Sequence, residues 1–199
     1  MTIRMKSLLL PAVVAAVLYP AQTQRAVAGE SPAADAQTDR AVSAVQAYGK
    51  ALKSELVAAM ESGGPLAAIE VCHTEAPAIA RRVSADQGLT VTRVSLKNRN
   101  PDAAPNEWQK EVLLSFEERA GSGEDPATLA WHDTAESADG EEYRFMKAIP
   151  ADGVCLACHG AALAPEVKVK LAELYPEDKA TGYALGDIRG AFVVTQKVD

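Results

Sequence analysis

The sequence predicts a protein of the α+β class, in which helices pack on an antiparallel sheet. Helical periodicity dominates the first half of the chain, whereas segments rich in β-branched residues cluster in the second half. Strands and helices do not alternate regularly, so the parallel sheet of βαβ units is not expected. With 199 residues, 48% of them hydrophobic, the chain is long enough for one domain with a sizeable core.

Two helical stretches are expected before the first strand. Thr38 is a candidate N-cap for the first, whose apolar side chains recur at spacings of three and four: Val45, Tyr48, Leu52, Leu56 and Ala59. The sequence SGGP at residues 62–65 should end it. The second stretch begins near Leu66 and has a similar stripe, formed by Ile69, Cys72, Ala76, Ile79 and Val83. Pro77 predicts that this stretch divides into two short helices.

Four later segments have the composition of strands: residues 89–96, 131–135, 143–149 and 188–198. Asp139 and Gly140 should form the turn between the second and the third. Between the first two strands, Asn106 and Gln109 predict a capping box at the start of a helix that runs to about Ala120. A short helix is expected over residues 165–174.

The first 28 residues have the layout of a secretory signal peptide. A positive start is followed by an apolar run over residues 8–18 and by small residues up to Ala28. The run is shorter than the roughly 20 residues that span a bilayer. We therefore predict cleavage after Ala28, a flexible tether over residues 29–37, and a single periplasmic or otherwise exported domain over residues 38–199 without a stable membrane anchor.

The formal net charge of the whole chain is −7, and the predicted signal peptide carries Arg4, Lys6 and Arg25 but no acid. The mature protein is therefore still more acidic than the whole chain. Such a charge is repelled by nucleic acid and by anionic lipid, so nucleic acid is not expected as a partner.

Residues 155–159, CLACH, match the attachment motif for haem c. Cys155 and Cys158 would each add to a vinyl group on one edge of the porphyrin, and the turn between them would bring His159 to the iron as an axial ligand. Gly153 and Gly160 leave room for the chain to approach the macrocycle. The cofactor expected here is one covalent haem c.

Three other sites use similar residues. A thioredoxin-like redox pair would want a βαβ context, which the sequence lacks. A structural zinc site could use Cys72, Cys155, Cys158 and one histidine, although a second close pair of ligands is missing. The third alternative is a plain disulfide. The export signal and the adjacent His159 favour haem.

The sixth ligand of the iron has several candidates after removal of the signal peptide: Met60, Cys72, His73, His132 and Met146. Cys72 is the cysteine that the motif does not use, and it lies on an apolar helical stripe. His73 is one residue further along the same helix and points about 100° away.

The residues around these positions resemble the exported single-haem c-type family with a PAS-like fold, members of which also occur as sensory domains of bacterial signalling proteins. The passages that match are AIEVCHTEAPAIA around Cys72, RVSLKNRNPDAAPNEWQ at residues 93–109, CLACHG, and YPEDKATGYALGDIRGA at residues 175–191. The resemblance implies a five-stranded antiparallel sheet flanked by helices. It also implies axial ligation by His159 and Cys72.

A thiolate ligand stabilises ferric iron and lowers the reduction potential. With both axial positions filled, electron transfer or redox sensing through an unknown protein partner is the expected function. The alternatives are a sensor of diatomic gas or redox state that signals through a partner, and a peroxidase-like enzyme with His132 or Arg99 in its distal pocket. Arg99 is otherwise a candidate partner for a haem propionate, or forms a salt bridge that ties its loop to the helix.

Overall fold

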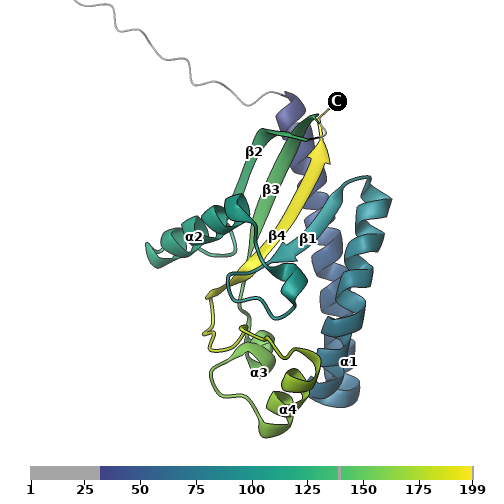
Figure 1. Ribbon diagram of the computed structural model, residues 1–199, viewed down its shortest axis with the longest axis vertical. Coiled ribbons are helices and arrows are strands. Elements are labelled where there is room, and N and C mark those ends of the chain that lie inside the picture. Colours follow the sequence, from purple (N-terminus) through teal and green to yellow (C-terminus); the bar gives the residue numbers. More distant parts are fainter. Residues whose placement is uncertain (1–31, 139, 199) are drawn as a thin grey trace, which may run out of the picture. The chain divides into compact units, whose positions relative to one another are not determined.

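A four-stranded antiparallel sheet with helices on its faces forms the centre of the protein, as the computed structural model shows for residues 32–138 and 140–198 (Figure 1). This confirms the α+β class. The elements are α1 (Pro32–Gln87), β1 (Thr90–Val94), η1 (Pro101–Ala103), α2 (Glu107–Gly121), β2 (Ala130–Ser137), β3 (Gly140–Pro150), η2 (Gly153–Cys155), α3 (Leu156–His159), α4 (Pro165–Leu174) and β4 (Ile188–Lys197). The predicted signal peptide lies outside the described residues.

The strands follow the order β1-β4-β3-β2, so the C-terminal strand β4 lies inside the sheet. Each of the four segments predicted to be strands forms one. The five-stranded sheet implied by the resemblance is wrong for the described residues. The segment that follows β1 contains Pro101 and Pro105, which cannot donate to a strand ladder, and it forms η1 and a loop instead. The segment that follows β3 forms η2 and α3.

α1 consists of two helices that meet at Gly64, whose φ of 67° and ψ of −161° are not helical. The predicted end at the SGGP sequence is therefore confirmed. The two halves lie side by side as a helical hairpin (Figure 1), and the Tyr48 hydroxyl donates to the Ala76 carbonyl at 3.2 Å. The break predicted at Pro77 is wrong: the second half continues through this proline to Gln87.

α1 starts at Pro32, before the expected cap at Thr38. The Thr38 hydroxyl instead lies 2.6 Å from the Tyr143 hydroxyl of β3 and ties the helix to the sheet. Of the predicted tether, residues 32–37 are thus helical, and residues 29–31 lie outside the described residues.

The two faces of the sheet are covered by different helices. On one face, α1 packs Tyr48, Ile79 and Val83 against β-strand residues such as Phe145. On the other, α2 packs its buried residues Val112, Leu113 and Phe116 against Leu129 and Met146. α2 has the predicted capping box: Asn106 accepts from the Gln109 backbone, and the Gln109 side chain accepts from the Asn106 backbone.

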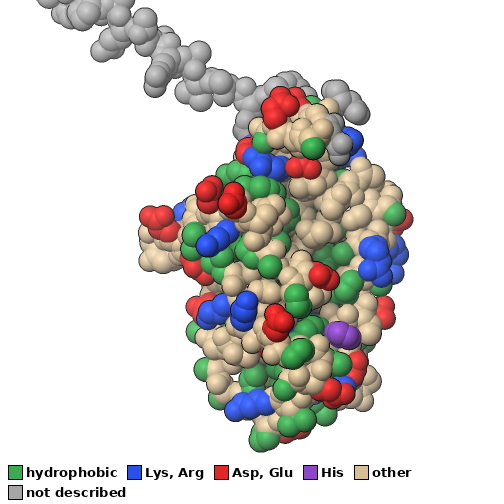
Figure 2. Space-filling model, in the orientation of Figure 1, with side chains coloured by type: hydrophobic (Ala, Val, Ile, Leu, Met, Phe, Trp, Pro, Cys, Tyr) green, Lys and Arg blue, Asp and Glu red, His purple; other side chains and the backbone are tan. Residues whose placement is uncertain are grey.

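The surface mixes charges of both signs. Acidic and basic side chains are interspersed over the face seen in Figure 2. No helix of the described part of the chain is both long and apolar enough to span a bilayer.

β3 and β4 change register between Ile149 and Pro150, opposite Gly190 and Ile188. Gly190 has a φ of 158°, and a Cβ built on it would lie 2.3 Å from the Val94 carbonyl oxygen of β1. A side chain at this position would therefore push β1 away from β4. This end of the sheet leads directly into the cysteine motif.

We predict that Gly190→Ala lowers the free energy of unfolding by ~1–3 kcal/mol, because it combines backbone strain with a clash against β1. Urea unfolding followed by circular dichroism measures this change. Gly121→Ala is the matched control, since a Cβ there meets nothing within 4 Å, and it should leave stability unchanged or slightly raised. Equal stability of the two variants would contradict the role assigned to Gly190.

Candidate functional site

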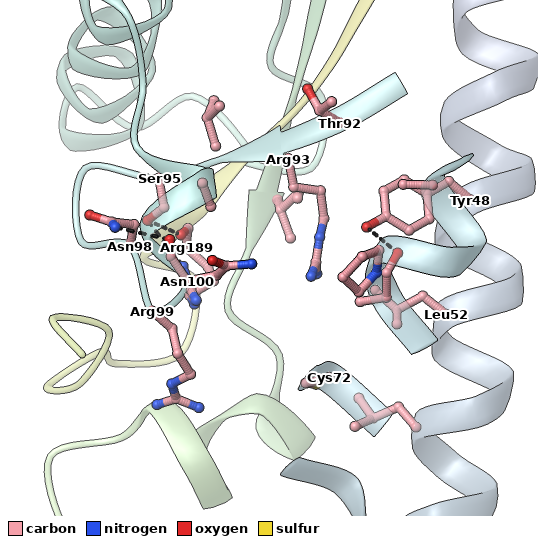
Figure 3. Close-up of a pocket in the computed structure, with 18 of the residues that line it drawn as sticks. Tyr48, Leu52, Cys72, Thr92, Arg93, Ser95, Asn98, Arg99, Asn100 and Arg189 are labelled. Carbon is pink, nitrogen blue, oxygen red and sulfur yellow. Dashed lines mark hydrogen bonds between the residues drawn. The ribbon is translucent and has the colours of Figure 1, made fainter. Parts of the chain in front are cut away.

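A cavity of about 630 Å³ lies between the helical hairpin α1, the edge strand β1 and the cysteine motif (Figure 3). Ligand cavities in proteins commonly have volumes of 300–1,000 Å³. Apolar side chains of α1 form much of its wall, among them Leu52, Leu56, Ala68 and Ile69. All three side chains of the predicted haem motif, Cys155, Cys158 and His159, also line it.

The motif is positioned by the short elements η2 and α3. The Asp152 side chain accepts from the Gly153 backbone at 2.6 Å, and the Asp152 backbone donates to the Cys155 sulfur at 3.4 Å. Gly160 ends α3, and a Cβ there would lie 2.6 Å from the Leu156 carbonyl oxygen. The chain can therefore turn sharply after His159 only with a glycine next to it.

His159 is held by a carbonyl from a distant part of the chain. Its Nδ1 lies 2.7 Å from the Ala180 carbonyl oxygen, which can only accept, so Nδ1 carries the proton. Arg189 Nε lies 3.2 Å from the same nitrogen, but this contact cannot then be a hydrogen bond, because both groups are donors. Nε2 keeps its lone pair, which is the arrangement of a metal-binding histidine.

The pKa of His159 is lowered to about 2, first by burial and then by the neighbouring Arg189 and Arg99. The imidazole is therefore neutral at physiological pH. A neutral ring with Nδ1 occupied is the form that can donate an electron pair to iron.

Arg99 joins three segments at the base of the cavity. Its Nε donates to Asp178 at 3.1 Å, and its Nη2 donates to the carbonyl oxygens of Cys158 at 2.6 Å and Ala180 at 3.2 Å. The salt bridge is thus with Asp178, and both groups are nearly inaccessible to solvent, with 7% and 11% of their side chains exposed. These bonds use Nε and Nη2, so Nη1 is the nitrogen that could contact a haem propionate. The contact of Arg99 with a propionate stays a prediction.

Of the five candidate sixth ligands, Cys72 and Met60 line the cavity. His73 is exposed and packs edge-on against Tyr175, at 5.2 Å between ring centroids. His132 stacks on Tyr143, and Met146 is buried on the other face of the sheet. The geometry thus separates Cys72 from its neighbour His73, which the sequence alone could not do.

Cys72 lies among positive charges. Burial raises the pKa of its thiol, while Arg93, Arg99 and Arg189 act in the opposite direction. Arg93, a minor candidate from the sequence, and Arg189, which the sequence did not indicate, both line the cavity. Strand periodicity also indicates Arg93, because it alternates in phase with Val91 and Ser95, two buried positions of the same segment.

These residues fit a haem better than the other predicted sites. No group of three or more histidine, cysteine or acidic side chains is placed to hold a metal ion among the described residues, which gives a structural zinc site no support. The three cysteines are free thiols rather than disulfide partners. A largely apolar cavity that contains three free thiols, a neutral histidine and several guanidinium groups matches a flat, apolar group with two carboxylates.

Two comparisons identify similar proteins. A sequence model described as Tll0287-like matches residues 9–196. The fold is similar to that of a solved structure titled "Crystal structure of the cyanobacterial heme-protein Tll0287", with a TM-score of 0.63 and 23% identity. That match covers 85% of this chain and 98% of the other. No curated protein matches the chain.

We predict that Arg99→Met lowers the free energy of unfolding by ~3–5 kcal/mol, because it leaves the buried Asp178 carboxylate without its partner. Chemical denaturation of the two proteins measures the difference. Arg119→Met is the control, since Arg119 makes an exposed ion pair with Glu124, and exposed pairs contribute little. If both substitutions had the same small effect, Arg99 would not be the link between these segments.

Proposed function

Because the chain belongs to the Tll0287-like family, we propose that it is an exported c-type haem protein with one haem attached through Cys155 and Cys158. The matching region spans nearly the whole chain, in agreement with the resemblance that the motifs indicated. The solved protein of similar fold is described as a heme-protein, which supports the choice of cofactor. The PAS-like arrangement implied by the resemblance is part of this proposal.

The observation that carries the proposal is that His159, with its Nδ1 protonated and its Nε2 free, lies beside the Cys155 and Cys158 thiols. Its Nδ1 proton is fixed on the Ala180 carbonyl at 2.7 Å, so the ring orientation and the free Nε2 are set before any cofactor enters. Cys155 and Cys158 line the same cavity. The three groups that covalent attachment and axial ligation require are therefore together in one apolar space.

Cys72 is the proposed second axial ligand, because it lines the cavity from α1 whereas His73 is exposed. A bound haem supplies a one-electron Fe(III)/Fe(II) couple. With Cys72 as a thiolate ligand, the ferric state would be favoured and the reduction potential lowered, and the nearby guanidinium groups would moderate that effect. The apolar residues of α1 would provide the apolar contact surface for the macrocycle. Low-potential electron transfer or redox sensing follows from this ligand pair.

A sensor function has one observation in its favour. The segment after α4 is bonded directly to the motif: the Tyr183 backbone donates to the His159 carbonyl at 3.0 Å, and the Gly182 backbone donates to the Gly160 carbonyl at 3.1 Å. The same segment carries Leu185, whose side chain is 70% exposed. A shift of His159 would move this surface, through which a protein partner could detect the redox state.

The site of action in this proposal is the periplasm or another exported location, reached after cleavage near Ala28. A haem c is attached to exported chains, so the location and the cofactor support each other. The redox or signalling partner is proposed to be a protein.

We predict that the mature protein, produced in a host that matures c-type haem, has the optical spectrum of a low-spin, thiolate-ligated haem in the ferric state. Cys72→Ala should abolish the thiolate features and leave the haem attached, because the thioethers come from other cysteines. Met60→Leu is the matched control, since Met60 also lines the cavity, and it should keep the parent spectrum.

The opposite pattern would contradict the ligand assignment: a parent-like spectrum for Cys72→Ala with a changed spectrum for Met60→Leu would make Met60 the ligand. A parent protein that contains no haem would contradict the proposal as a whole.

A further inference from the structure

The end of the cavity formed by the cysteine motif and the end away from it would contact different parts of a haem. The vinyl groups, which the cysteines attack, lie on one edge of the macrocycle, and the two propionates lie on the opposite edge. Attachment to Cys155 and Cys158 therefore sets the orientation of a haem, and its carboxylates must point away from α3. This orientation rests on the proposed function, because it takes the covalent attachment as given.

Arg99 and Arg189 lie at the attachment side. Arg99 donates to the carbonyl of Cys158 itself, at 2.6 Å. Arg189 lies 3.2 Å from His159 Nδ1 and donates to the Ser95 hydroxyl at 3.0 Å. Arg99 is thus tied to the cysteine motif and Arg189 lies against His159. Neither is placed where the propionate edge of the haem would lie.

Arg93 enters the cavity at a distance from these two guanidinium groups (Figure 3). Its side chain extends from β1 into the open space between β1 and α1, away from the cluster formed by Arg99, Asn98 and Arg189 (Figure 3). The guanidinium carbon lies 5.6 Å from the centroid of the Tyr48 ring. This cation–π contact holds the guanidinium at the wall of the cavity.

Arg93 is also unsatisfied. Its Nε is buried and has no hydrogen-bond partner, and no carboxylate of the described residues forms an ion pair with it. Asp102 is the acid among the described residues that line the cavity, and it is exposed. A buried N–H group without an acceptor is costly, so a ligand that places an anion beside Arg93 Nε would remove a penalty.

Asn100, which lies beside Asn98 and Arg189, provides a second donor across the space from Arg93 (Figure 3). Its Oδ1 accepts from the Asp102 backbone at 3.0 Å, and this bond fixes the orientation of the amide. Nδ2 consequently points into the space toward Arg93, as Figure 3 shows. Two donors of different kinds therefore face the position where a carboxylate would lie.

The geometry points to Arg93, assisted by Asn100, as the binding site for a haem propionate, in place of the Arg99 that the sequence suggested. A carboxylate there would accept two N–H groups of the guanidinium in the bidentate geometry that arginine favours. It would also supply the anionic partner that no described carboxylate provides for Arg93.

The test uses the haem-loaded mature protein and the variants Arg93→Met, Arg93→Lys and Arg82→Met. Arg82 is exposed on α1 and is not among the residues that line the cavity, so Arg82→Met removes the same charge from the surface. Resonance Raman spectroscopy reports the propionate bending modes, potentiometry reports the reduction potential, and thermal melting reports folding.

In Arg93→Met, we expect a shift of a propionate bending mode and a fall in the reduction potential, because an uncompensated carboxylate favours ferric iron. Arg82→Met should leave both unchanged. Arg93→Lys keeps the charge but not the paired N–H groups, so the potential should stay near the parent value while the bending mode still shifts.

Unchanged bending modes in a folded, haem-loaded Arg93→Met would overturn the assignment and leave the proposed function intact. If Arg93→Met does not fold, Arg93→Lys decides, and modes identical to those of the parent would overturn the assignment in the same way. A parent without covalent haem would instead overturn the proposed function, and this assignment with it.

Discussion

The hydrogen bond between His159 Nδ1 and the Ala180 carbonyl is the interaction on which the site depends. It fixes the tautomer and the ring orientation of His159. For this, the Ala180 carbonyl must itself be held in place. Arg99 holds it: the same Nη2 that donates to the Ala180 carbonyl donates to the Cys158 carbonyl. The guanidinium of Arg99 thus holds Cys158, which precedes His159, and Ala180, whose carbonyl accepts the hydrogen bond from His159.

Three stretches of chain that are far apart in sequence meet through this contact: the loop after β1, the cysteine motif and the segment between α4 and β4. The Lys179 backbone donates to the Asn98 carbonyl at 3.1 Å, and the Tyr183 backbone donates to the His159 carbonyl at 3.0 Å. The Asp178 carboxylate completes the cluster by pairing with Arg99. A rigid setting of this kind lets the site exist before the cofactor binds, which limits the reorganisation that a redox change requires.

The local patterns of the sequence predicted most of the fold. Alternation and β-branched composition located all four strands, and Asn106 with Gln109 located the start of α2. The errors came where a tertiary contact overrides a local preference. Thr38 is used to contact Tyr143 rather than to begin a helix, and the second half of α1 tolerates Pro77 because both helices of the hairpin are packed on the sheet. The count of five strands came from the family resemblance rather than from the residues.

The site was predicted unevenly for a similar reason. Cys155, Cys158 and His159 are adjacent in sequence, so their proximity required no knowledge of the fold. Cys72 could be suggested but not separated from His73, since the rotation of α1 against β1 depends on packing across the whole hairpin. The functions of the arginines could not be assigned, because Arg99 and Arg93 differ only in which end of the cavity they reach.

The central claim is that this chain holds its haem covalently through the motif, and the most direct measurement is mass spectrometry of the denatured mature protein. We expect a chain that begins at Gly29 and retains the mass of one haem after acid denaturation. Replacement of both Cys155 and Cys158 by alanine should remove that added mass. A mature chain without added mass, or a haem that is extracted by acid from the parent, would contradict the claim.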